Sequence, residues 1–402
     1  MGNILLLSNG HGEDLSGALI GKALRSLGHQ VEALPLVGAG TSYSKEKIKI
    51  LYKGKEFSTG GLGYTSIKGR LKEIFQGQII YLINRILRLM TISKKYDLLV
   101  IIGDIVPIFA SWLTTRPVAA YIVAYSSHYE GQLNLPWPCK EFLQSKRFER
   151  IYTRDALTAE DLSKQLKRNV MFLGNPFMDA LEKTNTRLPK CSFRIGLIPG
   201  SRFPEIEKNL LLMLSVVKIL ADEMLIHEEV SLDLALVNTL SDSNLHRLVN
   251  CLGWRVEKNI NTQSTELIKG NCTVSVRRES FGQILHSSDL VLAMAGTATE
   301  QAIGLAKPVL QIIGEGPQFT FRFADAQRRL LGPTVFCANG KPGSTKTLEE
   351  TAQMATSLLK RIKSDVNFQN ECNLQAIHRI GKSGGSKRIA ESISNYLLKP
   401  SR

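Results

Sequence analysis

The stretch IGLIPGSRFPEIEKNL, residues 195–210, joins an apolar run, a glycine turn and an amphipathic segment. This order predicts a strand, a tight turn and the start of a helix. At such a junction Gly200 would let the backbone approach a ligand, Ser201 would cap the helix, and Arg202 would add a guanidinium beside the free N–H groups of the first turn. The stretch predicts an α/β fold with a phosphate site at this turn. The alternative is an ordinary turn with a solvent-exposed arginine.

The same alternation continues on both sides of a polar stretch, residues 183–191, which we interpret as a linker. The expected strands are 3–7, 31–36, 96–102, 119–123 and 150–152 before it, and 195–198, 231–237, 272–276, 289–293 and 308–313 after it. The expected helices include 16–27, 67–90, 204–225, 241–252, 279–287 and 374–398, and residues 38–63 are expected to be irregular. This order predicts two Rossmann-like, doubly wound α/β domains, residues 1–183 and 184–365, facing each other across a cleft. The C-terminal segment, residues 366–402, is expected to pack back towards the first domain.

The charge of the chain is unevenly distributed. Of 402 residues, 43% are hydrophobic and 22% charged, as in a soluble protein with large cores, and the net charge is +15. Residues 45–95 hold 12 basic and 3 acidic residues. This excess favours an anionic partner, a membrane surface or a nucleic acid. The stretch lacks the aromatic interleaving of a nucleic-acid platform, so we expect an anionic membrane surface and no nucleic acid.

The cysteines and the N-terminal sequence indicate the cellular compartment of the protein. Six cysteines are scattered without metal-ligand spacing, which predicts reduced thiols and no disulfides. The N-terminal MGNILLLSNG lacks the cationic region and the long apolar run of a signal peptide, and no run reaches 18 apolar residues. We expect a cytoplasmic protein, or one that is peripheral on the inner face of a membrane.

One expected helix has an unusually broad apolar face. Residues 79–90 place Tyr81, Asn84, Arg85 and Arg88 three or four positions apart and leave the remaining surface apolar. Next to the basic stretch, such a helix is typical of one lying on a membrane surface. The alternative is a helix packed against its own sheet.

Polar side chains follow the expected strands of the first half. His11 and Asp14 follow the first strand, and Asp104 follows the buried strand at 96–102. Ligands of doubly wound sheets gather at the carboxyl ends of the strands, so we expect these three side chains at one cleft edge. Asp104 is the first candidate for a general base, with a helix cap as the alternative, and His11 is the second, with a structural hydrogen bond as the alternative.

Residues 296–301, GTATEQ, repeat the pattern of a strand followed by small residues and a helix start. Thr297 and Thr299 offer hydroxyls, and Glu300 and Gln301 fall in the first turn, where a carboxylate can bind the two hydroxyls of a ribose. Helix capping and compensation of the helix dipole are the alternative. Together with the turn at 200–202, this segment predicts a nucleotide diphosphate site. Further polar residues expected near the same edge are Gln318, Arg322 and Gln327.

Five segments, in the same order, resemble the lipid A disaccharide synthase family. PGSRFPEIEKNL resembles its PGSR-x-x-EI element, AGTATEQAIGLAKP its SGTAT-x-E helix start, and GNPFMDAL its GHP-x-x-D turn. IIGDIVPIF resembles the family's strand that ends in Asp-Ala-Pro-Asp-Phe, and EDLSGALIGKAL resembles its first helix. The resemblance implies a GT-B glycosyltransferase fold, a UDP-sugar donor in the second domain, and a lipid-linked sugar acceptor in the first domain at the membrane surface.

The resemblance also implies roles for single residues. Asp104 matches the family's essential Asp at a strand end. Asp14 matches the Asp that begins the family's first helix, and we expect Asp14 to bind the acceptor. The family's Trp-rich loop is replaced by residues 125–131, where we expect Ser126 and His128 to contact the acceptor. The residues that match the nucleotide-sugar elements are Gly200, Ser201, Arg202, Glu205, Gly296, Thr297 and Thr299.

This chain departs from the family pattern at several positions. The family's acid in the first loop lies where this chain has Gly10, and its second Arg after PGSR is Phe203. Its acid after GTAT lies where Gln301 stands, which leaves Glu300 as a substitute. These changes surround the sugar and the acceptor, and they predict a divergent relative with a different acceptor or sugar.

The expected chemistry is an inverting hexosyl transfer. Asp104 or His11 takes the proton of the acceptor hydroxyl, whose oxygen attacks the anomeric carbon as UDP leaves. We expect no metal and no cofactor besides the donor. Two alternatives stay open: a nucleotide-sugar epimerase of the same fold, and a non-catalytic GT-B scaffold.

Overall fold

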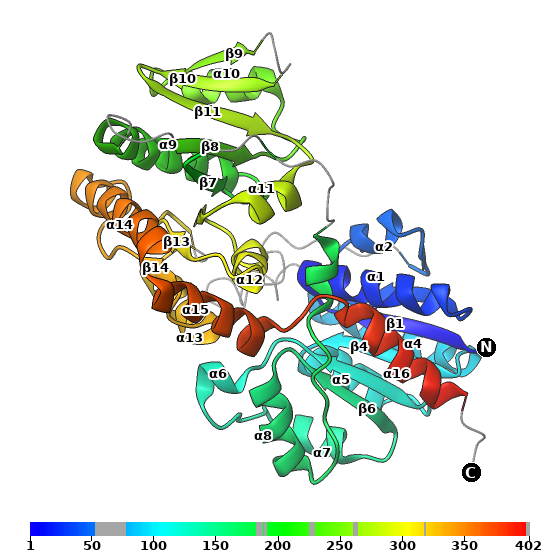
Figure 1. Ribbon diagram of the computed structural model, residues 1–402. Coiled ribbons are helices and arrows are strands. Elements are labelled where there is room, and N and C mark those ends of the chain that lie inside the picture. The colour runs from blue at the N-terminus through cyan, green and yellow to red at the C-terminus, as the bar shows by residue number, and fades with distance from the viewer. Residues whose placement is uncertain are drawn as a thin grey trace. The chain divides into compact units, whose positions relative to one another are not determined.

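The structure, a computed structural model, describes residues 1–52, 78–181, 188, 191–224, 230–259, 264–316 and 319–398. It divides into two compact units, Met1–Ala180 with Gly381–Arg402, and Leu181–Ile380 (Figure 1). The expected linker at 183–191 lies mostly outside the described residues. The expected C-terminal segment is divided, because residues 366–380 belong to the second unit and those from 381 onward to the first.

In the first unit, the described residues form a parallel sheet of six strands in the order β3-β2-β1-β4-β5-β6. Its strands are apolar runs buried between two layers of helices, as the sequence predicts for a parallel sheet. Strand order reverses between β1 and β4, where Ser8 is level with Ile102. The strands are β1 (Asn3–Ser8), β2 (Gln30–Pro35), β3 (Lys49–Ile50), β4 (Leu98–Gly103), β5 (Val118–Ile122) and β6 (Phe148–Thr153).

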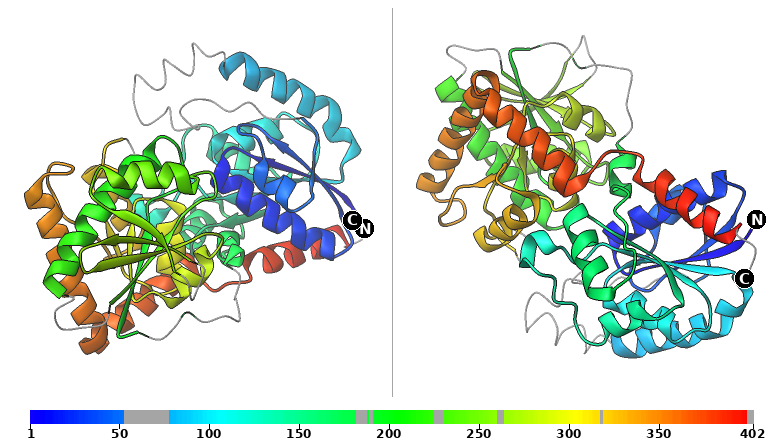
Figure 2. Two further views of the ribbon diagram at one scale, coloured as in Figure 1. Left: turned by 90° about the horizontal axis from the view of Figure 1, so that it is seen from above. Right: turned by 60° about the horizontal axis from the view of Figure 1, so that its bottom comes forward.

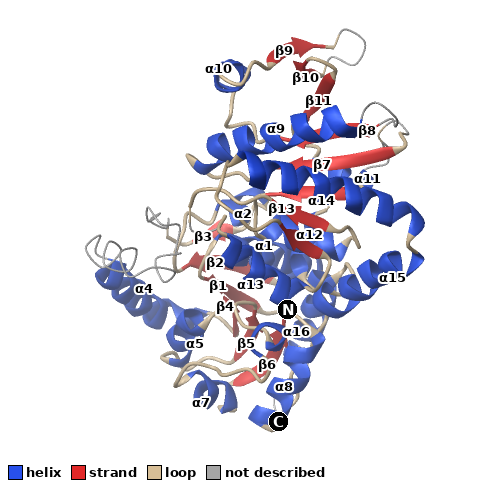
Figure 3. Ribbon diagram, turned by 90° about the vertical axis from the view of Figure 1, so that its left-hand side faces the viewer, coloured by secondary structure: helices blue, strands red, loops and turns tan. Residues whose placement is uncertain are grey.

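Helices cover both faces of this sheet (Figure 3). One buried cluster lies beneath α4, α5, α7 and α8, and another beneath α1, α2 and α16. The helices are α1 (His11–Ser26), α2 (Thr41–Lys45), α4 (Gln78–Ile92), α5 (Ile105–Trp112), α6 (Ser127–Glu130), α7 (Cys139–Gln144), α8 (Ala156–Leu166) and α16 (Gly385–Leu397), with short turns at η2 (Ser93–Lys95) and η3 (Pro176–Ala180).

The last helix, α16, packs along α1 in the first unit (Figure 2). Tyr152 donates to the hydroxyl of Ser392 at 2.8 Å, and the backbone N–H of Ser386 donates to Asp179 at 2.9 Å. The sequence predicted one helix at 374–398, and this is wrong. Gly381 and Gly384 adopt φ values of 83° and 88°, a left-handed conformation that interrupts a helix at this point.

In the second unit, the described residues form a sheet of eight strands in the order β14-β13-β12-β7-β8-β11-β10-β9. Of these, β9 and β10 are antiparallel additions at one edge. Strand order reverses between β12 and β7, where Ala293 is level with both Ile198 and Gln311. The strands are β7 (Phe193–Ile198), β8 (Val230–Ala235), β9 (Arg255–Lys258), β10 (Thr265–Lys269), β11 (Cys272–Arg277), β12 (Leu290–Ala293), β13 (Val309–Gln311) and β14 (Val335–Cys337).

The core of the second unit joins the sheet to α9 and α14. Apolar positions of α9 recur at helical spacing, for example Leu210, Met213, Leu214 and Val217, and all four are fully buried. The helices are α9 (Glu205–Met224), α10 (Asp242–Asn250), α11 (Phe281–Ser287), α12 (Thr297–Gly304), α13 (Phe321–Leu331), α14 (Thr345–Ser364) and α15 (Val366–Gln375), followed by the π-turn η4 (Ala376–Ile380).

Two local predictions need correction. The first helix begins at His11 and not at residue 16, so the glycine-containing segment after β1 is mostly helical. The expected irregular segment at 38–63 contains α2 and β3, and its residues from 53 onward lie outside the described part. The sequence did not predict these helical and strand residues, because they lie in short segments rich in polar residues and glycine.

Candidate functional site

Asp104 lies where strand order reverses in the first sheet. It follows β4 directly and is the N-cap of α5, because its Oδ1 accepts from the backbone N–H of Val106 at 2.9 Å. Asn9, which follows β1, donates its side-chain amide to the same oxygen at 3.0 Å. Burial raises the pKa of Asp104, and these two hydrogen bonds oppose the rise. The side chain therefore caps a helix at the edge where the sequence predicted a general base.

Asp14 lies in the interior of the first unit. Its carboxyl group is 1% exposed and accepts from the hydroxyl of Ser8 at 2.6 Å. Tyr43 in turn donates to Ser8 at 2.9 Å. Burial raises the pKa of Asp14 to about 7, although the Ser8 hydrogen bond lowers it. The expected direct contact of Asp14 with an acceptor does not fit this geometry, since its carboxyl group faces the core.

His11 is the first residue of α1 and follows Gly10. The backbone thus brings it to the carboxyl end of β1, in the first turn of a helix. Its side chain lies outside what the structure describes. A role for His11 in proton transfer stays a prediction.

Ser126 and His128 belong to a network that fixes two helix starts. The Ser126 hydroxyl donates to Asp155 at 2.7 Å and accepts from the backbone N–H of His128 at 3.2 Å. Asp155 also accepts from the backbone N–H of Thr158 at 2.7 Å and so caps α8. The imidazole Nε2 of His128 lies 3.8 Å from the Asp155 carboxyl. Sequence reasoning missed Asp155, although an Asp directly before a helical segment is a typical cap.

In the second unit, Gly200 brings the backbone close to the end of β12. Its φ is 95°, and a Cβ at this position would meet the carbonyl oxygen of Met294 at 3.0 Å. Ser201 and Arg202 follow and are exposed. The prediction that Ser201 caps the helix is wrong, because α9 starts at Glu205, after the turn at Pro204.

The start of α12 lies beside this turn, because β12 is the neighbour of β7. Gly296 is its N-cap, and Thr297 and Glu300 are half-buried in the first turn. The expectation that Thr299 offers its hydroxyl to a ligand does not fit the structure. Thr299 is fully buried and donates to the carbonyl of Ala295 at 2.6 Å. Gln301 is also buried, which leaves Thr297 and Glu300 at the edge.

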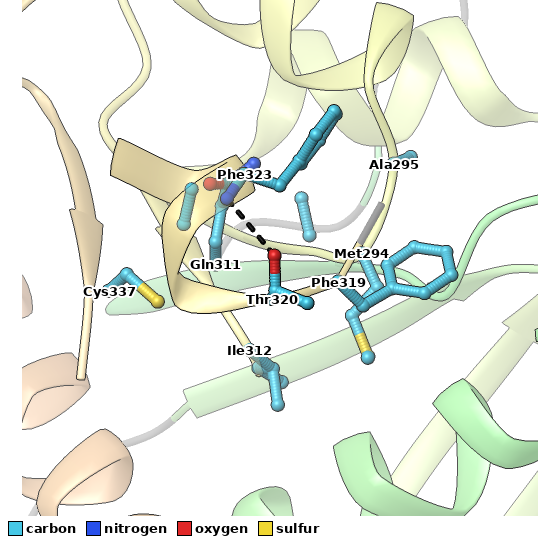
Figure 4. Close-up of a pocket in the computed structure, with 10 residues that line it drawn as sticks. Met294, Ala295, Gln311, Ile312, Phe319, Thr320, Phe323 and Cys337 are labelled. Carbon is cyan, nitrogen blue, oxygen red and sulfur yellow. Dashed lines mark hydrogen bonds between the residues drawn. The ribbon is translucent and has the colours of Figure 1, made fainter. Parts of the chain in front are cut away.

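A small pocket lies at the ends of β12 and β13 (Figure 4). Aromatic side chains border it from the segment before α13 and from its first turn, namely Phe319 and Phe323. Thr320 caps α13 by accepting from the backbone N–H of Phe323 at 3.2 Å. Sequence reasoning missed this pocket: of the residues expected nearby, Gln318 lies outside the described part, and Gln327 pairs with Gln311 beneath the sheet edge.

Two buried amide oxygens near this edge have no hydrogen-bond partner among the described residues, Oδ1 of Asn209 and Oε1 of Gln311. The side-chain amide of Asn209 donates to the carbonyl of Pro199 at 2.9 Å, which ties α9 to the turn before Gly200. A buried acceptor without a donor costs about 1–3 kcal/mol. The edge is thus suited to a polar ligand that supplies donors.

Two further properties concern metal ligation and membrane spanning. Within the described part of the chain, no group of three or more His, Cys, Asp and Glu side chains could hold a metal ion. Nor does any helix there combine the length and the apolar character needed to cross a bilayer.

Comparison of the sequence with protein-family models and with curated proteins gives no match. Solved structures match over the whole chain. The calicheamicin glycosyltransferase CalG4 has a TM-score of 0.65 at 14% identity, with 100% of both chains covered. UDP-GlcNAc 2-epimerase from Neisseria meningitidis, bound to UDP-GlcNAc, has a TM-score of 0.54 at 14% identity, covering 99% of this chain and 100% of that one. S. aureus MnaA, solved with UDP, has a TM-score of 0.56 at 16% identity, covering 100% and 99%. These matches confirm the predicted GT-B fold of two α/β domains with parallel sheets.

Proposed function

We propose that this chain is a glycosyltransferase that binds a UDP-sugar in its second unit. One observation supports this most directly: three strands that end level, β7, β12 and β13, are followed in turn by the Gly200 turn, the start of α12 and an aromatic-lined pocket. A nucleoside diphosphate needs a site for its phosphates, its ribose and its base. The Gly200 turn is suited to the phosphates, the start of α12 to the ribose, and the pocket to the base.

The turn and the helix start supply complementary charges. The exposed guanidinium of Arg202 and the backbone at Gly200 would hold the diphosphate and stabilise the charge that develops on it as the glycosidic bond breaks. The carboxyl group of Glu300 would accept from the ribose hydroxyls. The flat base would lie against Phe319 or Phe323.

The acceptor is proposed to be a lipid-linked sugar at an anionic membrane surface, on the cytoplasmic face, as the resemblance to lipid A disaccharide synthase implies. Its hydroxyl oxygen forms the new bond to the anomeric carbon, UDP leaves with the electrons of the old bond, and Asp104 takes the hydroxyl proton. The transfer inverts the anomeric centre and requires no metal, so turnover should persist in EDTA. Ser126 and His128 are assigned to positioning the acceptor loop.

A nucleotide-sugar epimerase is the second candidate, because structures of UDP-GlcNAc 2-epimerases match this chain over its full length. Incubation with UDP-GlcNAc alone separates the two. An epimerase would convert the sugar or release UDP without an acceptor, whereas the proposed transferase would release UDP in step with glycosylation of an added lipid. A scaffold without catalytic activity would do neither and would still bind UDP.

The first test is nucleotide binding by calorimetry with UDP, GDP and ADP. We expect selective binding of UDP, and about tenfold weaker binding by Arg202→Ala because a charge-assisted bond to phosphate is lost. Arg255→Ala is the matched control, since the Arg255 side chain is 74% exposed on the edge strand β9. Absence of binding to any nucleotide, or equal effects of the two substitutions, would contradict the proposal.

A further inference from the structure

The helix α4 (Gln78–Ile92) turns a charged residue inward. Arg85 is 3% exposed, and its Nε donates to the hydroxyl of Tyr81 at 2.9 Å. Its guanidinium lies 5.0 Å from the ring centre of Tyr81 and 5.8 Å from that of Tyr52. The sequence grouped Arg85 with Asn84 on one polar face, but the structure buries Arg85 and exposes Asn84.

The side of α4 that contacts the sheet is narrower than its apolar surface. Leu89 is buried in the core, and Leu82 and Ile86 pack against it. These positions share one side of the helix with Arg85, at spacings of three and four residues. The alternative of a helix packed against its own sheet is therefore correct for this side, and it leaves Ile80, Ile83, Leu87 and Met90 outside the core.

Those residues form an exposed row. Ile80, Ile83, Leu87 and Met90 are 68%, 50%, 56% and 40% exposed. Their spacings of three and four positions place them on one side of the helix, next to the side that packs. We call these four residues the α4 row. Contiguous apolar surface of this kind marks interaction sites on soluble proteins.

The charges around the α4 row indicate what it contacts. The helix sequence, QIIYLINRILRLMTI, contains no Asp or Glu. Arg88 is exposed on the adjacent side, and the exposed Lys94 and Lys95 follow in the turn after the helix. An apolar row beside basic side chains matches a bilayer whose hydrocarbon lies below anionic headgroups.

We propose that the α4 row docks the first unit on an anionic lipid bilayer, with Ile80, Ile83, Leu87 and Met90 inserted at the level of the acyl boundary and Arg88, Lys94 and Lys95 at the headgroups. The inference builds on the proposed function, because it names the surface that would bring the protein to a lipid-linked acceptor. It uses residues of the first unit alone and needs no nucleotide for its test.

The experiment is co-sedimentation of the full chain with vesicles of phosphatidylcholine, with and without 30% phosphatidylglycerol, as a function of lipid concentration. We expect binding to the anionic vesicles that weakens in high salt, and at least tenfold weaker partitioning of the double variant Ile83→Asp/Leu87→Asp. The control is Leu157→Asp, because Leu157 is a 43% exposed apolar residue of α8 in the same unit. This control should bind vesicles as the unchanged protein does.

Three outcomes would overturn the proposal: no binding of the unchanged protein to either vesicle, binding that the double variant retains, or an equal loss in Leu157→Asp. Analytical ultracentrifugation without lipid completes the test. A dimer that the double variant abolishes, together with no vesicle binding, would assign the α4 row to a second copy of the chain. UDP binding is measured in the same samples, so a failed donor site and a failed membrane surface give different results.

Discussion

The carboxyl edges of the two sheets follow one plan but present different chemistry. In each unit the strands on either side of the order reversal end level with one another. The edge of the first sheet carries the carboxyl group of Asp104, whose pKa is raised by burial. The edge of the second carries an exposed Arg202 and the buried amide oxygens of Asn209 and Gln311.

The two edges are suited to different tasks. A carboxyl group with a raised pKa is suited to accepting a proton at neutral pH. A guanidinium and unpaired amide oxygens are suited to binding a ligand that combines phosphate with N–H or O–H donors. The proposed transferase would use both: one edge to deprotonate the acceptor and the other to hold the leaving nucleotide. The comparison can be tested by changing each edge separately.

The largest effect is expected from Asp104→Asn. Asn caps helices about as well as Asp, so α5 and its hydrogen bond from Val106 should persist while the proton acceptor is lost. We expect kcat to fall by about 10²–10⁴, with the affinity for UDP unchanged. Steady-state kinetics and calorimetry on the same preparation measure both. Turnover within a factor of three of the unchanged enzyme would show that Asp104 is a cap alone.

The next effect concerns Asp14 and pH. Its pKa of about 7 in the folded protein lies above the usual value near 4 for an unfolded chain, so the folded state binds the proton more tightly. The stability due to this proton is complete below pH 4 and is lost as the pH rises from about 4 to 7. Over this pH range the free energy of unfolding should fall by a few kcal/mol. Burial also raises the pKa of Asp104, so its ionisation lowers the free energy of unfolding in the same direction as the pH rises.

Asp14→Asn should remove most of this dependence, because an amide stays neutral. The free energy of unfolding in urea, measured from pH 4.5 to 7.5, should then fall less steeply for the variant than for the unchanged protein. The control is Asp325→Asn, a 48% exposed position of α13 whose change should leave the slope as it was. An identical slope in all three proteins would mean that Asp14 ionises normally inside the unit.

The sequence predicted most of the strands and the residues that follow them, because both have local signals in the sequence. Buried parallel strands are apolar runs, and Gly200 and Asp104 directly follow such runs. The hydrogen bonds from Asn209 to Pro199 and from Gln311 to Gln327 could not be predicted in this way. Each joins two residues, 10 and 16 positions apart respectively, that only the folded chain brings together. Arg85 shows a second limit: periodicity tells which residues share one side of a helix, but not which side the sheet covers.

The smallest effect is expected from Ser126→Ala. The hydroxyl of Ser126 caps α6 and donates to Asp155, which in turn caps α8. Loss of a serine cap costs about 1 kcal/mol. If this loop is held by its internal hydrogen bonds, the substitution should lower the free energy of unfolding by that amount. The KM for the donor should stay unchanged, since the proposed donor site lies in the other unit. A rise in the KM for the acceptor without a loss of stability would place Ser126 in contact with the acceptor, and the first edge would then bind substrate as well as accept its proton.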